Sequence, residues 1–185
     1  METTPEARRW QTCVHEAGHA AAALLLGVEN IGAVVFDKGG GLATPTPETA
    51  TPAAAADYEP EKLDAAYRFD AWPDILRDAT FTAAGYAAVD LLLHNEKLES
   101  NVESYDGEMV RAAARSAIGL YCDPIAEMNF AYMAAARART LLKPVLWRVK
   151  LVAKELEKRG RLTCEQVVEA MYPEHVKTTT KESKL

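Results

Sequence analysis

Apolar residues recur every three or four positions along the first 28 residues, which is the spacing of one face of a helix. Pro5 suits the first turn of such a helix, Glu6 suits the positive end of its dipole, and Gly27 favours its end. The apolar stripe consists of Trp10, Val14, Ala17, Ala21, Leu24, Leu25 and Val28. The pattern predicts an amphipathic helix over residues 5–26.

The spacing changes after this segment. Residues 31–36 are mostly β-branched or aromatic, and the glycines at 39–41 follow them, which predicts a short strand ended by a turn. Residues 39–60 contain Thr-Pro pairs and a run of alanines, a composition that predicts a long, flexible loop. Loops of this length inside a compact domain are usually functional or mobile.

Helical periodicity returns over the rest of the chain. The predicted segments begin near residue 60 and then cover residues 73–94, 104 to beyond 115, 124–159 with a break around Pro144, and 163–171 after a Thr-x-x-Gln capping box. Together the patterns predict a mainly α fold with a short β strand or hairpin beside the first helix. We expect one domain over residues 1–172 and a disordered tail over residues 173–185.

Charge and hydropathy exclude several function classes. The net charge of −6 and the pI near 5.3 argue against a general nucleic-acid binder, which needs basic surface to neutralise phosphates. The N-terminus lacks the basic start and apolar core of a signal peptide. The longest apolar run, residues 20–28, is far shorter than the roughly 20 residues of a membrane span. These features predict a cytoplasmic protein.

The cysteines point to a reducing compartment. Cys13, Cys122 and Cys164 are odd in number and widely spaced, and no Cys-x-x-Cys pair occurs. Cys13 is expected to be a packed thiol, since two positions on a helix turn it away from His15.

The predicted first helix contains the segment His15-Glu16-Ala17-Gly18-His19, whose side chains can bind a metal ion and accept a proton. Residues i and i+4 project from one helix face, so His15 and His19 can ligate the same metal ion. Glu16 is placed to accept a proton from a water bound to that metal, which is the His-Glu-x-x-His arrangement of zinc-dependent peptide hydrolysis. Gly18 costs about 1 kcal/mol relative to alanine within a helix, so we expect another element to approach closely there.

A catalytic zinc takes three protein ligands, so one more is required. The extended motif with a third histidine six residues after the second is excluded, because Leu25 occupies that position. The remaining candidates in the sequence are Asp90, His94, Glu103, Asp106 and Glu108. Motif spacing alone does not choose among them.

The segment His15–Ala20 resembles the zinc motif His-Glu-Ala-Gly-His-Ala of the FtsH-type proteases, which are membrane-anchored, ATP-dependent metalloproteases. Similarity continues in chain order and covers about residues 7–172. Ile31–Phe36 followed by Gly40–Thr44 resembles that family's strand and glycine turn, and Ala83–Ala88 resembles its Gly-Gly-Arg-x-Ala helix. Tyr132–Leu142 and Leu151–Met171 resemble its closing helices.

The third ligand comes from this resemblance. Ser104–Asp106 resembles the family's Ser-Asn-Asp segment, whose aspartate binds zinc. The resemblance therefore implies that His15, His19 and Asp106 hold one Zn²⁺ per chain and that Glu16 is the general base. Read without the family, Asp106 would be a helix N-cap.

The chain departs from the family at two kinds of position. Tyr86 stands where the family has arginine, and Val89 stands where it usually has an acidic residue, so we expect different support around the ligands. The chain also lacks the Gly-x-x-x-x-Gly-Lys-Ser/Thr loop that binds nucleotide phosphates. We therefore expect a peptidase-like domain without its own unfolding motor.

These observations favour a zinc metallopeptidase that cleaves peptides or unfolded protein segments without ATP. A separate ATPase or adaptor could deliver the substrate, and the family's ring assembly leaves a homo-oligomer open. Residues 31–36 are expected to bind substrate backbone by edge pairing. One alternative is a regulatory or peptide-binding module with little turnover. Another is a repressor-cleaving His-Glu-x-x-His peptidase of a different family, with a different third ligand.

Overall fold

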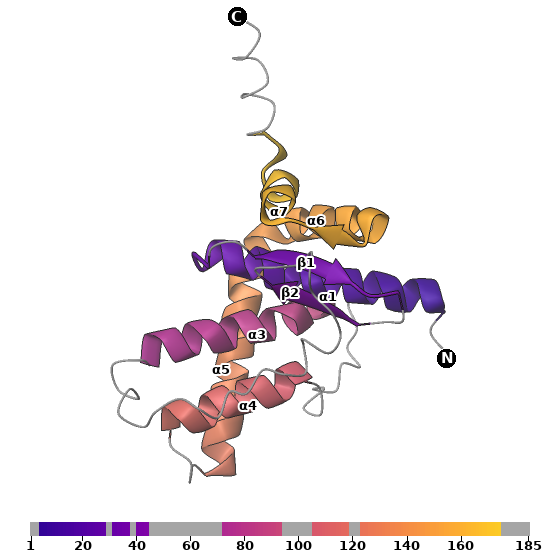
Figure 1. Ribbon diagram of the computed structural model, residues 1–185. Coiled ribbons are helices and arrows are strands. Elements are labelled where there is room, and N and C mark those ends of the chain that lie inside the picture. The colour runs from indigo at the N-terminus through magenta and orange to yellow at the C-terminus, as the bar shows by residue number, and fades with distance from the viewer. Residues whose placement is uncertain are drawn as a thin grey trace, which may run out of the picture.

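The computed structural model describes residues 4–28, 31–37, 40–44, 72–93, 105–118 and 123–174, and these residues are mainly helical (Figure 1). The helices are α1 (Pro5–Leu25), α3 (Trp72–Leu93), α4 (Tyr105–Ile118), α5 (Pro124–Leu142), α6 (Leu146–Arg159) and α7 (Cys164–Met171). The strands are β1 (Gly32–Val35), β2 (Gly41–Thr44) and β3 (Arg161–Leu162). The predicted mainly α class, with a short hairpin beside the first helix, is confirmed.

Helix α1 is the central element of the fold. The Thr4 side chain caps it by accepting a hydrogen bond from the Ala7 backbone at 3.2 Å, and Pro5 occupies its first turn as predicted. Nearly every residue from Cys13 to Ala23 is buried. The sheet, α3 and α6 each pack against α1 from a different direction (Figure 1). The predicted packed thiol of Cys13 is confirmed, because it is fully buried.

The close approach predicted at Gly18 occurs, and its partner is α3. A Cβ atom on Gly18 would lie 2.6 Å from the Ala84 carbonyl oxygen and 2.6 Å from the Ala88 Cβ. The small side chains of both helices let their backbones nearly touch, and this contact fixes α3 against the histidine-bearing part of α1.

The three strands form one antiparallel sheet in the order β2-β1-β3. Strand β1 pairs with β2 from Gly32 opposite Thr44 to Val35 opposite Gly41, and Ala33 pairs with Leu162 of β3. The prediction that residues 39–60 form one loop is therefore wrong at residues 41–44, which form β2. The prediction that residues 31–36 offer a free edge is also wrong, because β1 is paired on both sides.

The C-terminal helices follow their sequence signals. A 3-10 turn at Lys143–Val145 separates α5 from α6 at the predicted proline break. Gly160 ends α6 in the left-handed conformation, at φ 71°, and the predicted capping box of Thr163 and Gln166 opens α7. Strand β3, between these two signals, was not predicted, because two residues are too short for a periodic pattern.

Several predictions fall outside the described residues. They include the helix beginning near residue 60, most of the 39–60 loop and nearly all of the 173–185 tail. Among the described helices, none is long and apolar enough to cross a membrane.

Candidate metal centre

Three predicted ligands converge on one point. The Nε2 atoms of His15 and His19 are 3.1 Å apart, and Oδ2 of Asp106 lies 2.9 Å from the first and 3.2 Å from the second. Four ligands around zinc, with bonds near 2.0–2.1 Å, would be about 3.3 Å apart in a tetrahedron. The triangle of donor atoms therefore has the size that a tetrahedral zinc requires, with slight expansion on binding.

Two separate elements supply these atoms. His15 and His19 are one turn apart on α1, whereas Asp106 lies in the first turn of α4, 87 residues after His19. Arg115 of α4 joins Glu127 of α5 at 3.3 Å. This ion pair and the packing of α4 on α3 and α5 place Asp106 beside the histidines.

The surroundings of His19 set its tautomer. Its Nδ1 lies 2.9 Å from the backbone oxygen of Phe81, and a carbonyl only accepts, so Nδ1 carries the hydrogen and donates it. In neutral His19 the Nε2 lone pair is then free and faces His15 and Asp106, as metal binding requires. A different contact orients the ring of His15. It packs edge-to-face against the Tyr86 ring, with the ring centroids 4.7 Å apart.

Gly85 makes room for the two imidazoles. A Cβ atom there would lie 2.5 Å from Cε1 of His15 and 2.5 Å from Nε2 of His19. Both distances are well below van der Waals contact, so α3 can pass the histidines only because residue 85 has no side chain. The sequence contained this glycine, but the spacing of residues did not indicate its role.

Glu16 lies beside the three donor atoms on the same helix. Its side chain is only 4% exposed, and burial raises its pKa, although the nearby His15 and His19 oppose this rise. Strand β2 covers it, since a Cβ atom on Gly41 would lie 2.7 Å from Oε1 of Glu16. Only a glycine lets this strand approach the carboxylate so closely.

Without metal, the His19 and Asp106 side chains form a buried ion pair. Burial alone lowers the pKa of His19, but the Asp106 carboxylate outweighs it and raises that pKa to about 9. Burial also opposes ionisation of Asp106, yet His19 and His15 hold its pKa well below the usual range.

These shifts predict how the stability of the metal-free protein depends on pH. The raised pKa of His19 contributes stability fully below the unfolded value near 6.5, and this contribution disappears as pH rises through about 9. The carboxylate of Asp106 contributes above its unfolded value near 3.9 and loses its contribution in acid. We expect chelator-treated protein to lose on the order of 3 kcal/mol between about pH 6.5 and 9, measured by urea unfolding. A His19→Asn variant should show a flatter profile; an equally steep one would contradict this origin.

The other candidate ligands do not join the site. Asp90 pairs with Arg139 at 2.7 Å, and Glu108 pairs with Arg111 and Arg115. His94 and Glu103 lie outside the described residues. Within the part of the chain that the structure describes, His15, His19 and Asp106 form the one group of three metal-ligating side chains close enough to share an ion.

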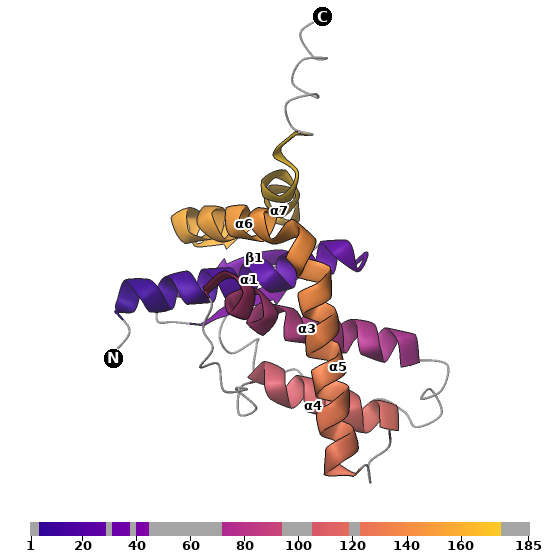
Figure 2. The ribbon, with the colours of Figure 1, turned by 180° about the vertical axis from the view of Figure 1, so that it is seen from behind.

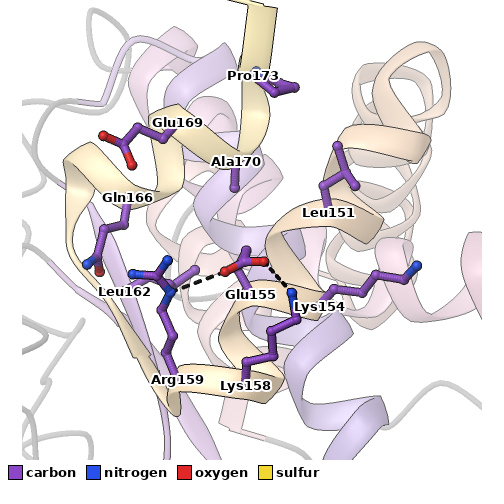
Figure 3. Close-up of a pocket in the computed structure, with 10 residues that line it drawn as sticks. All are labelled: Leu151, Lys154, Glu155, Lys158, Arg159, Leu162, Gln166, Glu169, Ala170 and Pro173. Atoms are coloured by element: carbon purple, nitrogen blue, oxygen red, sulfur yellow. Dashed lines mark hydrogen bonds and ion pairs between the residues drawn. The ribbon is translucent and has the colours of Figure 1, made fainter. Parts of the chain in front are cut away.

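A separate groove of about 380 Å³ lies between α6 and α7 (Figure 3). Within it, Glu155 pairs with Lys158 at 2.7 Å and with Arg159 at 3.2 Å, as the dashed lines in Figure 3 show. The carboxylate of Glu155 thus offsets part of the positive charge of Lys158 and Arg159, and the groove shares no residue with the triad.

Comparison of the chain with models of known protein families gives no match, and comparison with curated proteins gives none.

Proposed function

We propose that the chain is a zinc-dependent metalloendopeptidase, which hydrolyses peptides or unfolded protein segments and needs no ATP for the chemical step. The convergence of two imidazole nitrogens and one carboxylate oxygen beside a buried glutamate is the observation that carries this proposal. The resemblance of residues 15–20 and 104–106 to FtsH-type proteases supports the same assignment. Two nitrogen ligands and one carboxylate suit zinc, and they leave its fourth position open.

Each protein group has a distinct role in this proposal. His15, His19 and Asp106 would hold the ion, and Phe81 and Tyr86 would keep the two imidazoles oriented. Zinc held there would supply Lewis-acid chemistry, which lowers the pKa of water toward about 7. The Glu16 carboxylate would accept a proton from the attacking water and then donate it to the departing amide nitrogen.

Strand β2 is the better candidate for binding the substrate backbone. Among the described strands, β1 is paired on both sides, whereas β2 pairs only with β1. Because Gly41 of β2 touches Glu16, an extended peptide added to the outer edge of β2 would pass near the proposed general base. We therefore propose that substrate pairs with the outer edge of β2 at residues 41–43, and not with residues 31–36.

Metal content tests the centre directly. We expect about one zinc per chain in the wild type, because the three ligands define a single site, and loss of most of it in His19→Ala and Asp106→Ala. Mass spectrometry of the purified proteins measures this after zinc is supplied and the surplus is removed. Glu108→Gln is the matched control, since it changes an exposed acid two residues from Asp106 and should retain the metal.

If Asp106→Ala kept both zinc and peptidase activity, the third ligand would be a different residue. An Asp90, His94 or Glu103 variant that lost both would then support a His-Glu-x-x-His peptidase of another family. Wild-type protein that bound no zinc would contradict the proposed function altogether.

A further inference from the structure

One face of α5 is apolar over its N-terminal half, and no described element covers it. Among the described residues, six large hydrophobic side chains are exposed, and four of them belong to this helix. They are Tyr132 (63% exposed), Ile125 (61%), Met128 (49%) and Met133 (40%). The opposite face of α5 packs into the core through Phe130, Ala134, Ala138 and Leu142. Figure 2 shows α5 in front of α3 and α4, with no described element crossing its outer side.

The exposed residues form a continuous stripe with two different ends. Ile125, Met128 and Tyr132 follow one another at helical spacing, and Ala136, Arg139 and Lys143 continue the same line. From residue 125 to residue 143 the stripe is about 27 Å long at 1.5 Å per residue. Its N-terminal half is apolar and its C-terminal half is basic. We call this stripe, together with Met133 and Arg137 on its flank, the α5 face.

The basic half stands out in an acidic protein. Residues 128–154 include six lysines and arginines and no aspartate or glutamate, although the whole chain has a net charge of −6. Three of the six, Arg137, Arg139 and Lys143, belong to the α5 face, and the other three lie on α6. Arg139 forms an ion pair with Asp90 at 2.7 Å, so part of its charge is already offset. Arg137 and Lys143 are exposed, and no ion pair joins either of them to another described residue. The α5 face therefore offers positive charge to a partner.

We propose that the α5 face is a docking surface for an acidic amphipathic helix of another protein. The partner helix would place apolar side chains against Ile125, Met128 and Tyr132, and carboxylates against the basic half. Burial of the exposed apolar side chains would provide most of the affinity, and the opposite charges would set the register and orientation. The proposal does not depend on the peptidase activity, because no residue of the α5 face belongs to the metal centre.

A second copy of the chain fits this surface poorly. In an antiparallel pair of α5 helices, the apolar half of one copy would lie against the basic half of the other. In a parallel pair, Arg139 and Lys143 would face their own counterparts, and like charges repel. A nucleic acid would match the few cations but leave the three large apolar side chains without complementary contacts.

A designed peptide tests the proposal on the full chain. The probe is a fluorescein-labelled 18-residue helical peptide with leucines on one half of a face and glutamates on the other half, made in both orders. Fluorescence anisotropy should show saturable binding that weakens as salt is raised. The same peptide with lysine in place of glutamate should bind at least about tenfold more weakly, because its charge repels the basic half.

Variants of the face locate the binding. The double variant Met128→Ser with Tyr132→Ser, and separately Lys143→Glu, should each weaken peptide binding at least about tenfold while leaving the circular dichroism spectrum unchanged, since these side chains are exposed. Val168→Ser on α7 is the matched control, because Val168 is also an exposed apolar residue, and it should bind like the wild type.

Four results would overturn the proposal. The first two are that neither acidic peptide binds, and that the lysine peptide binds as tightly as the acidic ones. The other two are that the α5-face variants bind the acidic peptide as tightly as the wild type, and that this surface binds a second copy of the chain or a membrane. Sedimentation equilibrium would reveal the last case if the wild type formed a dimer that Tyr132→Ser dissociated. Vesicles of phosphatidylcholine with 30% phosphatidylglycerol would reveal it if they bound the wild type but not that variant.

Discussion

Replacing Glu16 with glutamine is expected to lower peptide hydrolysis by about 10²–10⁴-fold without removing the metal. Glutamine keeps the shape and most of the burial of the glutamate, but its amide cannot accept a proton near neutral pH. The ligands His15, His19 and Asp106 are unchanged, so zinc should stay at about one per chain. This pair of readouts separates the loss of a base from the loss of a site.

The measurement uses casein and an unfolded peptide as substrates, with product formation followed by mass spectrometry. Glu108→Gln is the matched control, since it makes the same chemical change at an exposed carboxyl on α4. Wild-type and control activity should agree within about twofold, because Glu108 is exposed and does not join the three proposed ligands. Equal activity of Glu16→Gln and the wild type would favour the regulatory or peptide-binding alternative.

Replacing Gly85 with alanine is expected to weaken zinc binding by at least about tenfold, although Glu16 and all three proposed ligands remain. The added Cβ would lie 2.5 Å from atoms of both His15 and His19. The rings have little room to retreat, because Tyr86 lies against His15 and the Phe81 carbonyl holds His19. At least one imidazole must therefore leave the geometry that binds the ion.

Two effects of this substitution on metal-free stability have opposite signs, so zinc affinity and metal-free stability are measured separately. Alanine is favoured over glycine within a helix by about 1 kcal/mol, so metal-free Gly85→Ala should lose less stability than the steric contact alone would cause. Zinc affinity is measured by competition with a chromophoric chelator, and metal-free stability by urea unfolding. Thr82→Ala, on the less buried side of α3, is the control and should bind zinc like the wild type. Unchanged affinity in Gly85→Ala would contradict the role assigned to Gly85.

Local signals predicted much of the helical structure. The proline, threonine and glycine residues that begin or end α1, α6 and α7 act through nearby backbone groups, so their effects can be read within a few residues. The strands were predicted less well. Strand β2 was assigned to a loop, and two-residue β3 was missed, because both are stabilised by pairing with β1 rather than by their own composition.

For the candidate site, the sequence by itself determined that His15 and His19 share one face of a helix with Glu16 beside them, because the geometry of a helix follows from its hydrogen bonding. Which distant carboxylate would join them was open from spacing, and only the resemblance favoured Asp106. Among the described candidates, tertiary packing brings Asp106 to the histidines by placing the first turn of α4 beside α1, whereas Asp90 pairs with Arg139. Packing alone also revealed why residues 41 and 85 are glycines, since each contact joins residues far apart in the chain and no local pattern encodes such a distance.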